Sequence, residues 1–174
     1  AELLKAKGPV LATRGNLNNH LGVPLTLARL QTDHWAAVIE CGMSHPGELR
    51  RLARLIRPRV AAITNVAAVH LEFFESVEQI ADAKLEIFET LDVGDTAVAP
   101  ADEPLLAERA RNTRGAACLF GDGPLSSIKA SVSSMSIEGS KFELDCLGTR
   151  VAVALPRTQN HSSASLMSFS SLSN

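Results

Sequence analysis

The sequence has no tyrosine, one tryptophan and six phenylalanines, so aromatic side chains are scarce. The core must therefore be built mainly from aliphatic residues. No run of about 18 consecutive apolar residues occurs, which is the length that crosses a bilayer, and the first residues do not resemble a signal peptide. These absences predict a soluble, cytoplasmic protein that has no membrane partner.

Strong net charge is also missing. The formal charge is -2 at pH 7 with both signs interspersed, which gives no electrostatic reason to expect nucleic acid as a partner. Three cysteines occur, an odd number, and they lack the spacing of metal ligands, which is typical of a reducing compartment. The 174 residues suit one domain with a sizeable core.

Up to residue 120 the pattern alternates between expected strands and helices. Strands are expected at 34–39, 60–66, 96–99 and 117–121, and helices from 23 onward and at 45–58, 76–91 and 101–113. This rhythm predicts an α/β fold in which helices flank a mostly parallel sheet. After Gly123, strand-like alternation with turn signals at Glu138-Gly139 and Leu147-Gly148 predicts a small antiparallel meander appended to that sheet.

The last 18 residues, 157–174, have a different composition. Seven of the thirteen residues from Ser162 onward are serine. Such a segment buries too little apolar area to offset the entropy that ordering costs. We therefore expect one domain at 1–156 and a flexible serine-rich tail at 157–174.

The helix expected at 76–91 carries an unusual lysine. Ser76 followed by Gln79 is a capping-box pattern, which predicts that the helix begins there. Lys84 falls in the middle of the apolar stripe, which consists of Val77, Ile80, Ala81, Ile87, Phe88 and Leu91. The acids expected on the solvent face are Asp82, Glu86 and Glu89. Either the lysine stem covers apolar surface while its ammonium reaches water, or Lys84 points at a site.

Two further residues favour a site at the carboxyl edge of the sheet. Glu40 ends the expected strand at 34–39, where nucleotide-hydrolysing sheets place a Mg²⁺ ligand. His70 lies in the loop between the next strand and the Lys84 helix. Ligands of open α/β sheets bind at this edge, so Glu40, His70 and Lys84 are predicted to converge there.

A polar loop precedes the first long helix and contains Asn16, Asn18 and Asn19. Asparagine side chains in such loops often cap their own backbone. Three of them within four residues are equally suited to present amides to a polar ligand. The residues alone leave both interpretations open.

Four phrases closely resemble the central ATPase domain of the Mur ligases. They are GNLNNHLGVPLTLARL, AVIECGMSHPGEL, ITNVAAVHLEFFESVEQIADAKLEIFETL and DTAVAPADEP, in the family's order over roughly residues 1 to 155. Within the family, the pattern GNxNNxxGVPLTLxxL is most like the members that add D-Ala-D-Ala to UDP-MurNAc-tripeptide. The resemblance implies an ATP-dependent, Mg²⁺-dependent ligase of peptidoglycan synthesis, which phosphorylates the tripeptide carboxylate and lets the dipeptide amine displace phosphate.

The resemblance also implies roles for single residues. Glu40 matches the acid that binds the Mg²⁺ on the ATP phosphates, and His70 matches a ligand of a second Mg²⁺. Lys84 matches a lysine that is carried as a carbamate, which turns a cation into an anionic oxygen ligand. Asn65 is expected to contact the nucleotide. The residues expected on the UDP-muramoyl-peptide side of the cleft are Thr13, Asn16, Asn18 and Asn19.

Parts of the family pattern are missing. No P-loop of the G-x-x-G-K-T-T kind occurs in the sequence, and the family's amino-terminal and carboxyl-terminal domains have no counterpart in it. We therefore expect a partial central domain that does not ligate alone and that associates with itself through exposed sheet edges. Two other interpretations remain, a fragment of a folylpolyglutamate synthase-like ligase and a non-catalytic α/β binding module.

Overall fold

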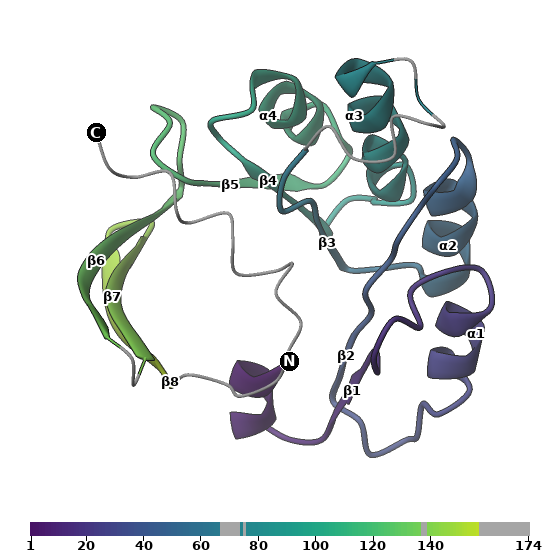
Figure 1. Ribbon diagram of the computed structural model, residues 1–174, viewed down its shortest axis with the longest axis horizontal. Coiled ribbons are helices and arrows are strands. Elements are labelled where there is room, and N and C mark those ends of the chain that lie inside the picture. The colour runs from purple at the N-terminus through teal and green to yellow at the C-terminus, as the bar shows by residue number, and fades with distance from the viewer. Residues whose placement is uncertain (67–73, 75, 137–138, 157–174) are drawn as a thin grey trace.

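The computed structural model in Figure 1 describes residues 1–66, 74, 76–136 and 139–156. Its parallel strands form two separately hydrogen-bonded sheets. In the smaller sheet, β1 (Val10–Ala12) pairs in parallel with β2 (Ala36–Val38). The larger sheet has the order β3-β4-β5-β6-β7-β8. The predicted mostly parallel α/β fold is confirmed, although the single continuous sheet is not.

The larger sheet begins with parallel strands, which are β3 (Val60–Ala62), β4 (Thr96–Pro100) and β5 (Ala116–Phe120). The apolar run 60–66 therefore gives a strand shorter than predicted. The other three strands are β6 (Ile128–Ser136), β7 (Gly139–Cys146) and β8 (Thr149–Pro156). The β6–β7 and β7–β8 pairings are antiparallel, as predicted for the meander, whereas β6 pairs in parallel with β5. Leu147 and Gly148 both have positive φ, so they form the two-residue turn that the sequence indicates between β7 and β8.

Short helices flank both sheets. They are η1 (Glu2–Ala6), α1 (Gly22–Leu27), α2 (Glu48–Ile56), α3 (Val77–Leu85), η2 (Glu86–Phe88) and α4 (Pro104–Arg111). Figure 1 shows α3 and α4 on one side of β3–β5, while α1 and α2 lie beside the smaller sheet. Within the described residues, no helix is long and apolar enough to cross a membrane.

The main core lies between β3–β5 and the helices α3 and α4. Alanines dominate the strand side of this core, and Leu106 of α4 and Phe88 of η2 fill the space opposite them. A second cluster joins α1 and α2 through Val23, Leu49 and Leu52, and Ile87 of η2 packs against it. The aliphatic character expected from the scarcity of aromatic residues is confirmed.

The helix that carries Lys84 begins where the sequence predicts. The Ser76 side chain accepts a hydrogen bond of 3.3 Å from the Gln79 amide. Ile80 is fully buried, as expected of the apolar stripe, but Val77 is 41% exposed. The prediction for Glu86 is also wrong, because this acid is only 6% exposed and does not lie on the solvent face.

Candidate functional site

Three of the predicted site residues form one hydrogen-bonded unit at the carboxyl edge of the smaller sheet. The Thr13 amide donates to the carbonyl oxygen of Val38 at 3.1 Å, which places Thr13 beside the end of β2. The Thr13 hydroxyl accepts from the Glu40 amide at 2.9 Å. Asn18 Nδ2 then donates to Glu40 Oε1 at 3.0 Å. Asn18 therefore orients the Glu40 carboxylate. Because Glu40 is exposed, a ligand can reach this carboxylate.

The asparagines of the preceding loop have different contacts. Asn19 Oδ1 accepts from the amides of Leu21 and Gly22 at 3.1 and 2.9 Å, and so satisfies the start of α1. Asn18 contacts Glu40 and is therefore tied to the site. Asn16 is exposed, and its backbone carbonyl oxygen accepts from the backbone amide of Asn18 at 2.8 Å. Of the two open interpretations, backbone capping describes Asn19, whereas Asn18 faces a candidate functional group.

Lys84 is tied to the carboxyl edge of the larger sheet. Its Nζ donates to the carbonyl oxygen of Asn65, which follows β3, at 2.8 Å. The side chain is partly buried, and this burial lowers the pKa of Lys84 below its usual value. The ammonium is thus held by the chain at this edge and does not only reach water, while a role of Lys84 in a site remains a prediction.

One cavity of about 230 Å³ connects the two edges. Residues 41–43, directly after Glu40, line one wall, and residues 62–65 at the end of β3 line another. Lys84, Leu49 and Ile87 complete the lining. The segment that follows Glu40 and the side chain of Lys84 therefore face the same space.

The predicted convergence of Glu40, His70 and Lys84 remains a prediction, because Lys84 lines the cavity whereas Glu40 only directly precedes the residues that line it. His70 lies outside the described residues. Among the residues that the structure describes, no group of three or more His, Cys, Asp and Glu side chains is arranged to hold a metal ion. Glu40 is exposed at this edge, and its part in cation binding remains a prediction.

Cys41 lines the same cavity but is not suited to act as a thiolate. Burial, together with the negative charge of the neighbouring Glu40, raises the pKa of the Cys41 thiol to about 11. The thiol therefore stays protonated at neutral pH. Neither a nucleophile nor a thiolate metal ligand is expected at this position.

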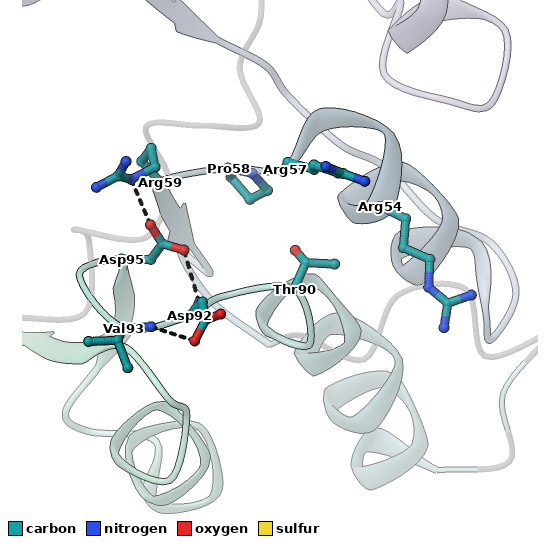
Figure 2. A pocket seen from close by; sticks show the side chains of 8 residues that line it. All are labelled: Arg54, Arg57, Pro58, Arg59, Thr90, Asp92, Val93 and Asp95. Carbon is teal, nitrogen blue, oxygen red and sulfur yellow. Dashed lines mark hydrogen bonds and ion pairs between the residues drawn. The ribbon is translucent and has the colours of Figure 1, made fainter.

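A larger cleft of about 720 Å³ lies at the opposite edge of the larger sheet (Figure 2). Arg59 directly precedes β3 and Asp95 directly precedes β4, and the two form an ion pair at 2.7 Å. Figure 2 shows that the guanidinium groups of Arg54, Arg57 and Arg59 do not converge. This cleft therefore offers no focused anion site, and it is remote from Glu40 and Lys84 in the fold.

Glu86 is a residue of this region that the sequence patterns misplace. Its carboxylate is buried and accepts from the Gly47 amide at 2.7 Å. Helical periodicity groups Glu86 with Asp82 and Glu89, which are exposed, so no local signal marks it as buried. Its partner lies 39 residues earlier in the chain.

The family model described as Mur ligase middle domain matches residues 1–163. The UDP-N-acetylmuramoyl-tripeptide--D-alanyl-D-alanine ligase of Escherichia coli (strain K12) is 35% identical over 175 residues, which cover 99% of this chain and 39% of that protein. The Haemophilus influenzae ligase of the same name is 36% identical, over 87% of this chain and 33% of that protein. The chain thus spans less than two fifths of the length of both relatives.

Solved structures agree with these relatives. A crystal structure of MurF from Acinetobacter baumannii superposes with a TM-score of 0.79 at 31% identity, covering 88% of this chain and 34% of that one. The MurF ligase of Thermotoga maritima in complex with ADP gives a TM-score of 0.77 at 28% identity, covering 91% of this chain and 37% of that one. A folylpolyglutamate synthase from L. casei shares the fold alone, at 19% identity and a TM-score of 0.54. The chain therefore belongs to the Mur ligase family, and its residues correspond to the middle domain of these ATP-dependent ligases.

Proposed function

We propose that this chain forms part of an ATP-dependent ligase that adds D-Ala-D-Ala to UDP-MurNAc-tripeptide in peptidoglycan synthesis. The observation that carries this proposal is the cavity between residues 41–43 and 62–65, because Glu40 lies beside it and Lys84 lines it. Relatives named for this reaction, with identities of 35 and 36%, support the choice of substrates. Folylpolyglutamate synthases have lower identity, at 19 to 20% in two of their structures.

Glu40 is proposed to hold Mg²⁺. Magnesium sites of ATP-using enzymes commonly have one or two protein carboxylates, and phosphate oxygens and water supply the other ligands. A single exposed carboxylate that Asn18 orients at 3.0 Å fits this requirement. When bound, Mg²⁺ supplies charge neutralisation to the transferring phosphoryl group. His70 is proposed as a ligand of a second Mg²⁺, as the resemblance implies.

Lys84 is proposed to act as a carbamate. Carbamate formation joins the amine nitrogen to the carbon of CO₂ and releases one proton, so it requires the neutral amine. The burial that lowers the pKa of Lys84 increases the neutral fraction. A carbamate nitrogen keeps one N–H, so it can still donate to the Asn65 carbonyl oxygen as Nζ does. The product carries a negative charge and can face a metal, which an ammonium would repel.

The remaining assignments extend this arrangement to the substrates. Asn65 lines the cavity and is proposed to contact the nucleotide. Thr13, Asn16, Asn18 and Asn19 are proposed to line the UDP-muramoyl-peptide side. Thr13 and Asn18 also orient Glu40, because both are hydrogen bonded to it.

In the reaction, the tripeptide carboxylate oxygen takes the γ-phosphoryl group of ATP, which forms an acyl phosphate and releases ADP. The D-Ala-D-Ala amine then attacks the acyl carbon, loses a proton and displaces phosphate. The protein's own groups contribute position and charge, which is the main requirement in phosphoryl transfer. The predicted cytoplasmic location and self-association through sheet edges remain predictions.

A chimera tests this function. Residues 1–156 of this chain would replace the aligned segment of the Escherichia coli ligase, and phosphate release would be measured with ATP, the tripeptide precursor and D-Ala-D-Ala. We expect turnover that depends on the dipeptide and falls about a hundredfold or more in the Glu40→Gln chimera. A folded chimera that uses glutamate and a folate instead of these substrates would contradict the proposal.

The isolated chain is expected to show only background phosphate release, because no P-loop amides are present to hold the β- and γ-phosphates. Titration with Mn²⁺ distinguishes the proposed ligase function from the non-catalytic α/β binding module. Failure of Mn²⁺ to bind near Glu40 at millimolar concentration would favour a non-catalytic binding module.

A further inference from the structure

The two sides of the candidate site belong to different sheets. Within the described residues, no hydrogen-bonded ladder joins β2 to β3. The distance between the segment after Glu40 and the end of β3 is therefore not set by strand pairing. The two parts meet through the helices, where α2 packs against η2 and α3.

Glu86 is the polar anchor of that helix contact. Both of its carboxylate oxygens lie within hydrogen-bond distance of the Gly47 amide, at 2.7 and 2.9 Å. Oε2 also accepts from the Arg50 amide at 3.2 Å. These amides belong to the amino end of α2, where intrahelical partners are missing and negative charge is favoured. Gly47, the N-cap, has no side chain to serve there, so an acid from η2 caps α2.

Arg50 of α2 contacts both Glu86 and Glu89. Its guanidinium makes two hydrogen bonds to Glu89, at 2.6 and 2.7 Å, and lies 3.4 Å from Glu86 Oε1. The buried carboxylate is thus paired with a cation and with two amides, as a buried charge requires. The Arg50–Glu89 pair is exposed and contributes little, so the buried Glu86 carboxylate is the group that holds the amino end of α2.

The anchor lies next to the residues that line the cavity. Lys84 is two residues before Glu86, and Ile87 is the residue after it, and both line the cavity. On the other side, Gly47 ends the loop that contains residues 41–43, which form the opposite wall. A shift of the amino end of α2 would therefore move one wall of the cavity relative to Lys84.

We propose that Glu86 is a positioning residue of the ligase site, which sets the place of residues 41–43 relative to Lys84 by holding the amino end of α2. The proposal rests on the proposed function only in taking this cavity as the ligand site. Glu86 contacts no reacting atom in this account and acts through the loop and the helix.

Alkylation of cysteines in the folded chain tests the positioning directly. Cys41 lines the cavity, whereas Cys118 lies on β5 and serves as an internal reference. In Glu86→Gln we expect the alkylation rate of Cys41 to rise about tenfold relative to that of Cys118, which corresponds to about 1.4 kcal/mol of local opening free energy. Global destabilisation by the core variant Leu106→Ala should raise both rates together.

Glu86→Gln is the main variant because an amide oxygen can still accept from one amide, so the chain is expected to fold. Glu89→Gln is the matched control, since it removes an exposed carboxylate from the same arginine. The proposal is overturned if the Cys41 rate in Glu86→Gln stays within about twofold of the original chain or rises only in parallel with Cys118.

A metal titration separates this proposal from the proposed function. If the original chain binds Mn²⁺ near Glu40, we expect Glu86→Gln to weaken binding about tenfold and Glu89→Gln to leave it unchanged. Equal binding by the original chain and by a folded Glu86→Gln would overturn the positioning role. If the original chain does not bind Mn²⁺ but Cys41 becomes selectively reactive, the proposed function fails and the anchoring by Glu86 is supported.

Discussion

Lys84→Met keeps most of the apolar stem of the lysine and removes its charge. In the folded protein the ammonium donates a hydrogen bond of 2.8 Å to the Asn65 carbonyl oxygen, and the side chain is partly buried. The substitution therefore removes one charged hydrogen bond and one desolvation cost together. The substitution therefore distinguishes a contribution of Lys84 to stability from a contribution to the reaction.

The two contributions have opposite signs. A hydrogen bond from a charged donor contributes about 1.5–3 kcal/mol, and the desolvation that lowers the pKa of Lys84 offsets much of it. Methionine packs its thioether where the lysine stem lay. We therefore expect the free energy of unfolding to change by less than about 1 kcal/mol, which is a change in Tm of at most about 2–4 °C.

The pH dependence has a definite sign. Because the folded-state pKa of Lys84 lies below the usual value of 10.5, the unfolded chain keeps the proton to higher pH. Between these two values stability rises with pH, and Lys84→Met should lose that rise. Lys129→Met, at an exposed position of β6, should retain it.

Chemical denaturation at several pH values measures the stability half of this prediction. ¹³C NMR in ¹³C-bicarbonate measures the chemical half, and we expect a carbamate signal that Lys84→Met abolishes and Lys129→Met keeps. A loss of more than about 2 kcal/mol in Lys84→Met would refute the reasoning, since it would make Lys84 a structural residue. A carbamate signal that survives Lys84→Met would place the modification elsewhere.

Two further predictions concern single residues. Ser76→Ala removes the acceptor of the Gln79 amide and should destabilise the protein by about 1 kcal/mol in urea unfolding, and a neutral effect would contradict the capping role. Cys41, whose pKa is raised from 9.0 to about 11, should react with iodoacetamide about a hundredfold more slowly than a free thiol at pH 8, with the rate still rising near pH 10. A rate that levels off near pH 8 would exclude this burial.

Local sequence patterns predict those helices and turns that are determined by interactions between residues close together in the chain. Ser76 starts α3 because its hydroxyl accepts the amide three residues on, and Leu147-Gly148 turns the chain because both residues adopt positive φ. The apolar stripe of α2 likewise buries Leu49 and Leu52. In each case the physical reason lies within a few residues of the pattern.

The features that could not be predicted from the sequence depend on contacts between segments that are far apart in the chain. Glu86 resembles its exposed neighbours at helical spacing, yet it is buried because the amino end of α2 supplies amides to it. The apolar run from residue 60 forms a strand only to Ala62, since hydrophobicity alone does not distinguish a paired strand from a buried loop. Glu40 and Lys84 could be assigned from the sequence to a strand end and to the helix after the next strand, whereas the cavity that Lys84 lines depends on helix packing.

The proposed ligase function requires a cation site at the carboxyl edge, beside Glu40 and the cavity that Lys84 lines. Paramagnetic broadening by Mn²⁺, followed in two-dimensional NMR spectra of the chain, locates such a site residue by residue. We predict that the amides of Gly42 and Asn65 broaden first and that Glu40→Gln removes the effect. Broadening that begins at Asp92 and Asp95, at the opposite edge of the sheet, would contradict the account.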